Sequence, residues 1–525
     1  MSRFTKIAAL LIAIAMIASL AACGSTNGGG GGGNAPAADN ADRHYAVDKD
    51  TVVVCTADET PAISARGHSA VAGNYINQLT YEQLIQIDKN LAPQPWLAES
   101  YEYTEQSDGA YLWTFHLHKG VKFHDGTEMH AEDVVASLEA AAKSPEVQIN
   151  TTSFRDPHVI DEYTVGLYTD GPSAAVLYDL SGHGNAIEPK ALIDSGNDFN
   201  AKPIGTGPYK FVNWKISEQL EFTRFDDYWN KDRMPAIKNI IWKIIPEGSA
   251  RTIALQAHEV DYIIELDTND IDLIKGDEGL VLLDVPSLAF NFLCLNNTVD
   301  PFGNVNVRRA INAAVNRDDI ITVALNGEGM ASVAQTTYGF ETCDTTGFVG
   351  YNVEKAKEFA AASGVDLSKV SFEVICSDDT KRRAGQVIQE NLDTAFGMGV
   401  ELVSMDLATY LSQTAQGNFE GFIGGYTGSN MVTWIKGLFH STQIGGSNKT
   451  RTNDPKVDAM IEEITRTIDT DKRIELENEF TRYMNDLCPQ VPIYQVNKCE
   501  AYNKYLGDIF LGPSGRFYCE EWAWQ

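Results

Sequence analysis

The chain has 525 residues and carries 72 acidic against 41 basic side chains, which gives a net charge of −31 at pH 7. A surface this acidic is a poor match for nucleic acid, whose phosphates require Lys and Arg, and it is repelled by anionic lipid headgroups. The length and the 43% hydrophobic content are sufficient for two or three domain cores.

Residues 1–22 have the pattern of a secretory signal peptide. Arg3 and Lys6 precede an apolar run from Ile7 to Ala22, which ends on small residues. A membrane-spanning helix needs about 20 apolar residues, so the run is short for a permanent anchor. An uncleaved N-terminal anchor is the alternative interpretation.

The next segment predicts a flexible tether. Six consecutive glycines, Gly28 to Gly33, are followed by Asn, Ala, Pro and Asp residues up to position 50. Such a segment buries no apolar surface and loses much conformational entropy on ordering. With an end-to-end distance of about 5–6 Å × √n, it spans on the order of 30 Å.

Leu20-Ala21-Ala22-Cys23 resembles the lipobox of bacterial lipoproteins. The resemblance implies cleavage before Cys23 and lipidation of its thiol. Each buried methylene of an acyl chain contributes about 0.8 kcal/mol, so a multiply acylated cysteine holds a soluble domain at a membrane. No second run of 18 apolar residues occurs, so we expect the lipid to anchor the mature chain. The lipidated Cys23 and the glycine-rich tether together form the expected segment 23–50.

The first half of the mature chain reads mainly as strands. The pattern predicts a strand at 51–57 and an amphipathic helix at 74–87. Residues 112–120 alternate, with Trp113, Phe115 and Leu117 on one face, and predict a half-buried strand. A helix with acidic residues in its first turn is predicted at 131–142. Further strands are predicted at 162–169, 205–214, 218–225 and 238–245.

After Arg308 helices alternate with strands, which favours crossover units around a partly parallel sheet and an α/β fold. The helices are predicted at 308–315, 318–327, 353–364, 380–396 and 407–415, and the strands at 371–377, 400–405 and 419–426. Two long helices follow, the first of which begins at the Asp454-Pro455 cap. Short strands are predicted for the tail.

The sequence contains no recognisable enzyme motif. It lacks GxSxG, HExxH, a phosphate-binding GxxxxGK[ST] loop and a GxGxxG that opens a helix, so we expect no enzymatic activity and no cofactor. His116, His118, His124 and His130 raise the possibility of a metal site, but two histidines on the outer face of a strand are usually only solvated. No CxxC pair occurs, and a Cys499–Cys519 disulfide is conceivable for an exported chain.

Six segments resemble, in order, the bacterial extracellular solute-binding proteins of the peptide/nickel class, family 5, which are receptors of ABC importers. They are LAESYEYTEQSDGAYLWTFHLHKGVKFHDGTEMHAEDVVASL (97–138), PIGTGPYKFVNW (203–214), FTRFDDYWN (222–230), RTIALQAHEVDY (251–262), VRRAINAAVNRDDII (307–321) and TNDPKVDAMIEE (452–463). The resemblance covers roughly residues 50–525. It also implies that His124 belongs to a structural strand-turn-helix unit and not to a metal site.

The resemblance implies a two-lobed, periplasmic-binding-protein-like α/β fold with a hinge and an extra inserted domain. By the family layout, lobe I comprises residues 51–80, 201–290 and 495–525, the inserted domain 81–200, and lobe II 291–494. A ligand that touches both lobes binds the closed state better, and this differential affinity shifts the population towards closure.

The resemblance also suggests where the ligand binds. Oligopeptide receptors of this family carry an aspartate for the peptide ammonium after the strand that corresponds to 419–426, and here the best-aligned residue is the neutral Ser429. Tyr426, Ser429, Asn430 and Trp434 are the cleft candidates, with packing at the edge of the lobe as the alternative. Glu59 is a further candidate that could supply the missing charge, or it is a solvated turn residue.

The resulting expectation is a lipid-anchored receptor on the outer face of the cytoplasmic membrane. It would act as a monomer, capture a solute, most simply a peptide, and deliver it to the membrane permease of an ABC importer. A nickel or other metal chelate, or another small organic solute, is the alternative ligand. A surface hydrolase is a remote alternative, because no nucleophile or metal-ligand set is recognisable.

Overall fold

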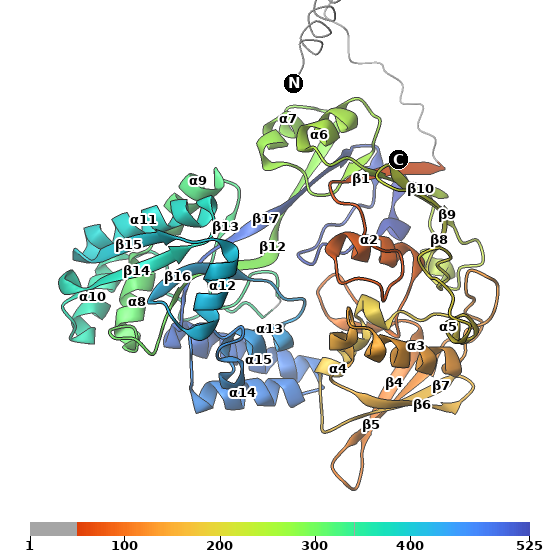
Figure 1. Cartoon of the computed structure of the whole chain (residues 1–525), viewed down its shortest axis with the longest axis horizontal. Coiled ribbons are helices and arrows are strands. Elements are labelled where there is room, and N and C mark those ends of the chain that lie inside the picture. The colour runs from red at the N-terminus through yellow and green to blue at the C-terminus, as the bar shows by residue number, and fades with distance from the viewer. Residues whose placement is uncertain (1–49, 341) are drawn as a thin grey trace, which may run out of the picture. The chain divides into compact units, whose positions relative to one another are not determined.

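The computed structural model describes residues 50–340 and 342–525; the expected signal peptide, Cys23 and the tether lie outside this range. Its central feature is a mixed sheet in the strand order β15-β14-β16-β12-β17-β11-β1-β10-β9-β8. We call the half with β16, β14 and β15 lobe II, and the half with β11, β1, β10, β9 and β8 lobe I. The antiparallel pair β12 (Leu280–Leu295) and β17 (Val491–Asn503) joins the two halves (Figure 1).

Lobe I is built on short strands of alternating or apolar sequence. Its strands are β1 (Thr51–Thr56), β8 (Tyr209–Lys215), β9 (Gln219–Arg224), β10 (Asn239–Ile244) and β11 (Tyr262–Ile263), and its helices are α2 (Val71–Thr80), α6 (Gly248–Gln256) and α7 (Ile271–Lys275). The tail adds β18 (Leu506–Gly507) and β19 (Ala523–Trp524). The buried Val52, Tyr209 and Trp242 belong to one core of this lobe.

A second, antiparallel sheet with the order β4-β5-β7-β6 stands apart from the central one. Its strands are β4 (Ala98–Glu105), β5 (Tyr111–Leu117), β6 (Arg155–Asp161) and β7 (Thr164–Thr169), and it is accompanied by α3 (Ala131–Lys143), α4 (Ala175–Leu180), α5 (Lys190–Asp194) and the small pair β2 (Ile85–Ile87) and β3 (Pro93–Pro95). Trp113, Phe115 and Leu117 are buried, as their alternation predicts. They pack with Val134 and Leu138 of α3 in one core.

Lobe II follows the predicted alternation of helices and strands. Its helices are α8 (Val305–Ala314), α9 (Arg317–Leu325), α10 (Val353–Ser363), α11 (Asp379–Phe396), α12 (Leu407–Gln416), α13 (Met431–Phe439), α14 (Pro455–Arg466) and α15 (Thr470–Leu487), and its strands are β13 (Met330–Ala331), β14 (Ser371–Cys376), β15 (Gly399–Ser404) and β16 (Gly421–Tyr426). β14 pairs in parallel with both β15 and β16, which confirms the partly parallel sheet. Asp454 caps α14, with Pro455 in its first turn.

Two sequence predictions are corrected. The helix expected at 74–87 ends at Thr80, because Ile85–Ile87 pair with β3 instead. The tail contains β17, a strand of 13 residues, where only short strands were predicted. The partner of β17, the 16-residue β12, was not predicted at all. Strands this long have no special local signal, because their length is set by pairing with each other.

The seven cysteines among the described residues are free, so the conceivable Cys499–Cys519 disulfide is not formed. The Sγ of Cys499 instead lies 3.5 Å from Asp284 Oδ1. None of the helices within 50–340 and 342–525 is long and apolar enough to cross a membrane.

Glu500 on β17 is fully buried and accepts a hydrogen bond from the Tyr262 hydroxyl. Burial raises the pKa of Glu500 to about 7; the ammonium of Lys498 and the bond from Tyr262 lower it, and Glu265 raises it. The folded state therefore holds a proton on this carboxyl that the unfolded chain, with an ordinary carboxyl pKa, releases at lower pH. This group contributes most stability below about pH 4.5 and loses its contribution as the pH rises through 7.

We therefore expect Glu500→Gln to gain stability relative to the unmodified chain between pH 4.5 and 8, by an amount on the order of 3 kcal/mol at most. Urea unfolding at both pH values measures the difference. Tyr262→Phe is the matched variant: losing the donor moves the pKa of Glu500 further up, so this variant should lose stability over the same range. A stability difference for Glu500→Gln that stays constant with pH would contradict the assignment.

Candidate functional site

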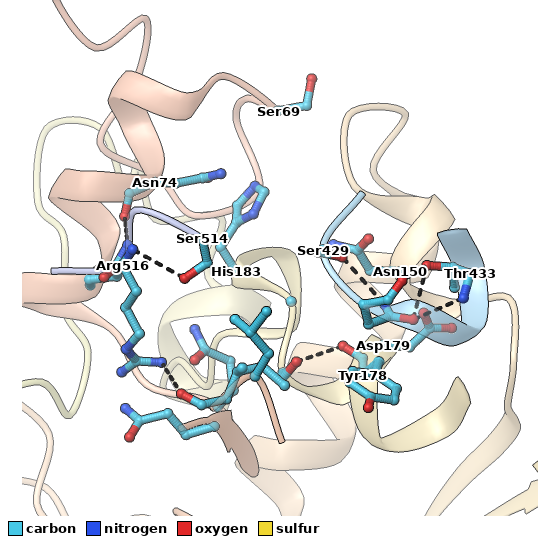
Figure 2. Close-up of a pocket in the computed structure, with 18 of the residues that line it drawn as sticks. Ser69, Asn74, Asn150, Tyr178, Asp179, His183, Ser429, Thr433, Ser514 and Arg516 are labelled. Atoms are coloured by element: carbon cyan, nitrogen blue, oxygen red, sulfur yellow. Dashed lines mark hydrogen bonds between the residues drawn. The ribbon is translucent and has the colours of Figure 1, made fainter. Parts of the chain in front are cut away.

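A cleft of about 840 Å³ is lined from both sides of the β12/β17 pair. Lobe I contributes α2 and the tail around Arg516, the segments near α4 contribute Asn150 and His183, and lobe II contributes Tyr426 to Ser447. Figure 2 shows Asn74, Ser514 and Arg516 on one side and Ser429 and Thr433 on the other. This volume lies within the range of sites that bury small organic ligands and short peptides.

The lobe II wall consists of the end of β16 and the start of α13. Tyr426 is the last residue of β16, and Asn430 caps α13 by accepting the backbone N–H of Thr433 at 2.9 Å. Ser429 Oγ accepts a hydrogen bond from Asn430 Nδ2 at 3.3 Å. The structure thus brings Tyr426, Ser429 and Asn430 together in the cleft.

Trp434 does not line this cleft. Its side chain has no exposed surface, and its ring lies 5.3 Å from that of Phe290 and 6.2 Å from that of Tyr426, both in edge-on contacts. It therefore packs behind Tyr426, which corresponds to the packing alternative considered for it. A direct contact between Trp434 and a ligand stays a prediction.

Glu59 lines a smaller neighbouring cavity of about 280 Å³. Its Oε1 accepts the indole N–H of Trp214 at 2.8 Å and the backbone N–H of Ser217 at 2.7 Å. Val71 and Tyr75 line both the cleft and this cavity, so the two spaces are adjacent. The carboxylate of Glu59 is therefore held by hydrogen bonds within lobe I. It lines the smaller cavity and not the cleft that Ser429 lines.

Glu82 is a cleft residue that the sequence does not reveal. It is buried, and its carboxylate accepts four hydrogen bonds at 2.7–2.9 Å, from Thr206, Tyr228, Trp96 and Trp229. Burial raises the pKa of Glu82, and the four donors lower it. The network fixes the position of the chain just after α2. Its donors lie 14 to 147 residues from Glu82, so no local signal announces it.

The histidine nearest the cleft is not one of the four singled out in the sequence. His183 stacks on His68 with ring centroids 5.3 Å apart and an angle of 7° between the ring planes. Burial lowers the pKa of both rings, that of His68 to about 4, so the pair is neutral at pH 7. The His183 Nε2–H faces the backbone oxygen of His68 at 3.1 Å. His183 can therefore offer the cleft a neutral hydrogen-bonding ring.

His124 is held in a structural role. Its Nε2 lies 2.9 Å from the carbonyl oxygen of Gly207, and burial lowers its pKa to about 4. His116 and His130 each face a glutamate, at 3.9 and 3.6 Å. Within the part of the chain that the structure describes, no three His, Cys, Asp or Glu side chains gather as a metal site would require.

Comparison with known proteins agrees with this geometry. The heme-binding protein A of Haemophilus influenzae is 26% identical over 84% of this chain and 86% of its own length. The dipeptide-binding protein of Escherichia coli is 27% identical over 81% of this chain and 85% of its own length. The solved structure of HbpA2 from Haemophilus parasuis, 23% identical, superimposes with a TM-score of 0.81 over 90% of this chain and all of the other.

The sequence profile of the bacterial extracellular solute-binding proteins, family 5 middle, matches residues 92–446. That range includes α3, the β8–β10 strands, the first half of lobe II and the α13 wall of the cleft. One assignment follows from the two-lobed fold, the cleft between the lobes and the match of the family profile to most of the chain. This chain belongs to family 5 of the bacterial extracellular solute-binding proteins.

Proposed function

We propose that this chain is a peptide receptor that closes lobe I on lobe II around its ligand and delivers it to an ABC importer, without chemical turnover. The observation that carries the proposal is the cleft, whose lining residues come from both lobes. A ligand that contacts Asn74 or Arg516 on one side and Ser429 or Asn430 on the other favours the closed state over the open one. A relative that covers most of the chain is named a dipeptide-binding protein.

The proposed domain bounds are 51–80, 201–290 and 495–525 for lobe I, 81–200 for the inserted domain and 291–494 for lobe II. The separate β4-β5-β7-β6 sheet supports the inserted domain. The proposed junctions at 290/291 and 494/495 fall inside β12 and β17, the two strands that run from one half of the sheet to the other. These strands form the proposed hinge.

The proposed ligand contacts on lobe II are Tyr426, Ser429 and Asn430, with Trp434 supporting Tyr426 from behind. Glu59 is the proposed alternative holder of a ligand ammonium. For that role its carboxylate would have to leave the N–H groups of Trp214 and Ser217, which lie at 2.8 and 2.7 Å. Exchanging two such bonds for one new contact is unfavourable, so Ser429 is the better-supported neighbour of the ligand.

A second candidate ligand is a metal chelate of the heme type. The heme-binding protein A is similar over 84% of this chain, so an anionic, ring-shaped chelate is a specific alternative to a peptide. His183 lines the cleft, and Nδ1 of its ring would be available to the metal because Nε2 bonds to the His68 carbonyl oxygen. The same hinge closure would serve either solute.

The receptor is proposed to be a monomer on the outer face of the cytoplasmic membrane, anchored through a lipid on Cys23. The family supports an extracellular location. The anchor is supported by the sequence alone, because Cys23 lies outside the described residues. The tether at 24–50 would let the folded part stand off from the membrane and reach its permease.

The proposed function is tested by identifying the ligand and then measuring closure. Native mass spectrometry of protein purified without refolding identifies a retained solute, and a calorimetric screen of di- and tripeptides with neutral side chains, with hemin in parallel, gives affinities. A true ligand should reduce the radius of gyration in small-angle X-ray scattering and raise the Tm. An unchanged radius at saturation contradicts closure, and binding of hemin but no peptide contradicts the peptide assignment.

We predict that the peptide amine is not held by an ion pair at Ser429. N-acetylation of a bound peptide should change its affinity by less than about tenfold, which corresponds to about 1.4 kcal/mol. Calorimetric titration of matched free and acetylated peptides measures this change. If Glu59 holds the ammonium instead, acetylation abolishes binding and Glu59→Gln has the same effect.

We predict that Cys23→Ala releases the protein from membranes into the soluble or medium fraction, because the acyl chains are lost together with the thiol. Fractionation followed by a carbonate wash measures the distribution. A variant that stays in the washed membrane would show that the uncleaved run at 7–22 is the anchor.

A further inference from the structure

The charged side chains that line the cleft differ in how many hydrogen-bond or ion-pair partners they have within the protein. The carboxylate of Glu82 already accepts four hydrogen bonds, and that of Glu520 is paired with Arg233 at 2.8 Å. Asp179 accepts the backbone N–H of Ser153 at 3.2 Å, and burial raises its pKa. Glu82 and Glu520 are therefore held by groups of the protein, whereas Glu146, which also lines the cleft, is exposed to solvent.

Arg516 forms no ion pair with Glu520 or Glu82. Burial lowers the pKa of Arg516, and the charges of these two carboxylates raise it. No carboxylate within 4.0 Å pairs with it among the residues that the structure describes. Its guanidinium donates one long bond, from Nη1 to the Ile87 carbonyl oxygen at 3.5 Å, and its Nε has no acceptor. Its Cζ lies over the ring of Tyr518, 5.2 Å from the ring centroid. A guanidinium has five N–H donors, so most of its hydrogen-bonding capacity is unused.

Lys436 provides a second cation from the other wall. It lies on α13, three residues after Thr433, and at this spacing both side chains project from neighbouring positions on one helix face. Both line the cleft. The Lys436 ammonium is exposed and, in the described part of the chain, forms no ion pair. Figure 2 shows Arg516 across the cleft from Thr433 and Ser429.

We propose that Arg516 binds a carboxylate of the ligand, with Lys436 closing on the same ligand from lobe II, so that the receptor selects solutes with a free carboxylate. The proposal rests on the proposed function, because it needs a ligand that spans the cleft. A planar guanidinium fork matches a carboxylate in bidentate geometry, and Lys adds a compact positive charge. With a neutral Ser429 on lobe II, the anionic end of the ligand provides the charged contact that draws the lobes together.

Two kinds of solute carry this group. A peptide presents its C-terminal carboxylate, and a heme-type chelate presents propionate side chains. The recognition chemistry is the same, so the experiment uses a matched pair for each source. The first pair is the tightest-binding neutral peptide of the screen as its free acid and as its C-terminal amide. The second pair is hemin and its dimethyl ester.

Calorimetric titration of the full mature chain should show a free acid that binds at least tenfold more tightly than its amide or ester. Charge-assisted hydrogen bonds account for a preference of roughly 10- to 100-fold. Arg516→Gln should bring this preference close to one, and Lys436→Gln should reduce it about threefold. Lys357→Gln on the exposed surface of α10, outside the cleft, is the matched control and should leave the preference unchanged.

Equal affinity for acid and amide, or for hemin and its ester, overturns the proposal. A preference that survives Arg516→Gln also overturns it. If peptides fail to bind while hemin shows a preference that depends on Arg516, the peptide function is wrong and the carboxylate site stands. If Arg516→Gln does not fold, two other variants decide the question. Arg516→Lys keeps the positive charge but loses the planar guanidinium, and Lys436→Gln changes an exposed side chain. A preference for the free acid that is unchanged in both variants overturns the proposal.

Discussion

The pairing of β12 with β17 is the contact on which the rest of this structure depends. The two strands pair from Leu280↔Asn503 to Leu293↔Val491, and the register shifts between Pro286 and Phe290 and again between Asn291 and Phe292. On one side β17 pairs with β11 of lobe I, and on the other β12 pairs with β16 of lobe II. The two halves of the sheet are therefore joined through a two-stranded ribbon, which can twist more than a wide sheet. A separate backbone hydrogen bond, from Ala174 N–H to Thr465 O at 2.9 Å, links the proposed inserted domain to α14.

The irregular part of this ribbon is braced by one side chain. Gln495 donates from Nε2 to the Ser287 carbonyl oxygen at 2.8 Å and to Thr337 Oγ1 at 2.5 Å, while its Oε1 accepts the Tyr338 N–H at 2.8 Å. The bond to Thr337 is buried and the other two are partly buried, so breaking them without replacement is costly. The shift in register is thus held in place by specific hydrogen bonds.

The two walls of the cleft differ in how they are held. On the lobe I side Glu82 binds two tryptophans, a tyrosine and a threonine, so that wall is fixed by a saturated buried carboxylate. On the lobe II side the wall is the capped start of α13, backed by the buried Trp434. A fixed wall on each side and a two-stranded ribbon between the lobes are what a capture mechanism by hinge closure requires.

Much of the local structure follows from local sequence. The alternation of Trp113, Phe115 and Leu117 predicts their burial, and the Asp454-Pro455 pair predicts the start of α14, because side-chain periodicity and capping act within a few residues. The sequence also identifies the family through six ordered segments, and it places Tyr426, Ser429 and Asn430 where the cleft is found.

The remaining features depend on contacts between distant residues. The segment 81–87 has a helical pattern, yet it leaves the helix because Glu82 is bound by donors as far away as Trp229 and because Ile85–Ile87 pair with β3. Arg516 enters the cleft only because the tail returns to α2, where Phe517 N–H bonds to Gln78 at 3.0 Å. Such positions are set by burial and hydrogen bonding across more than a hundred residues, and local periodicity carries no information about them.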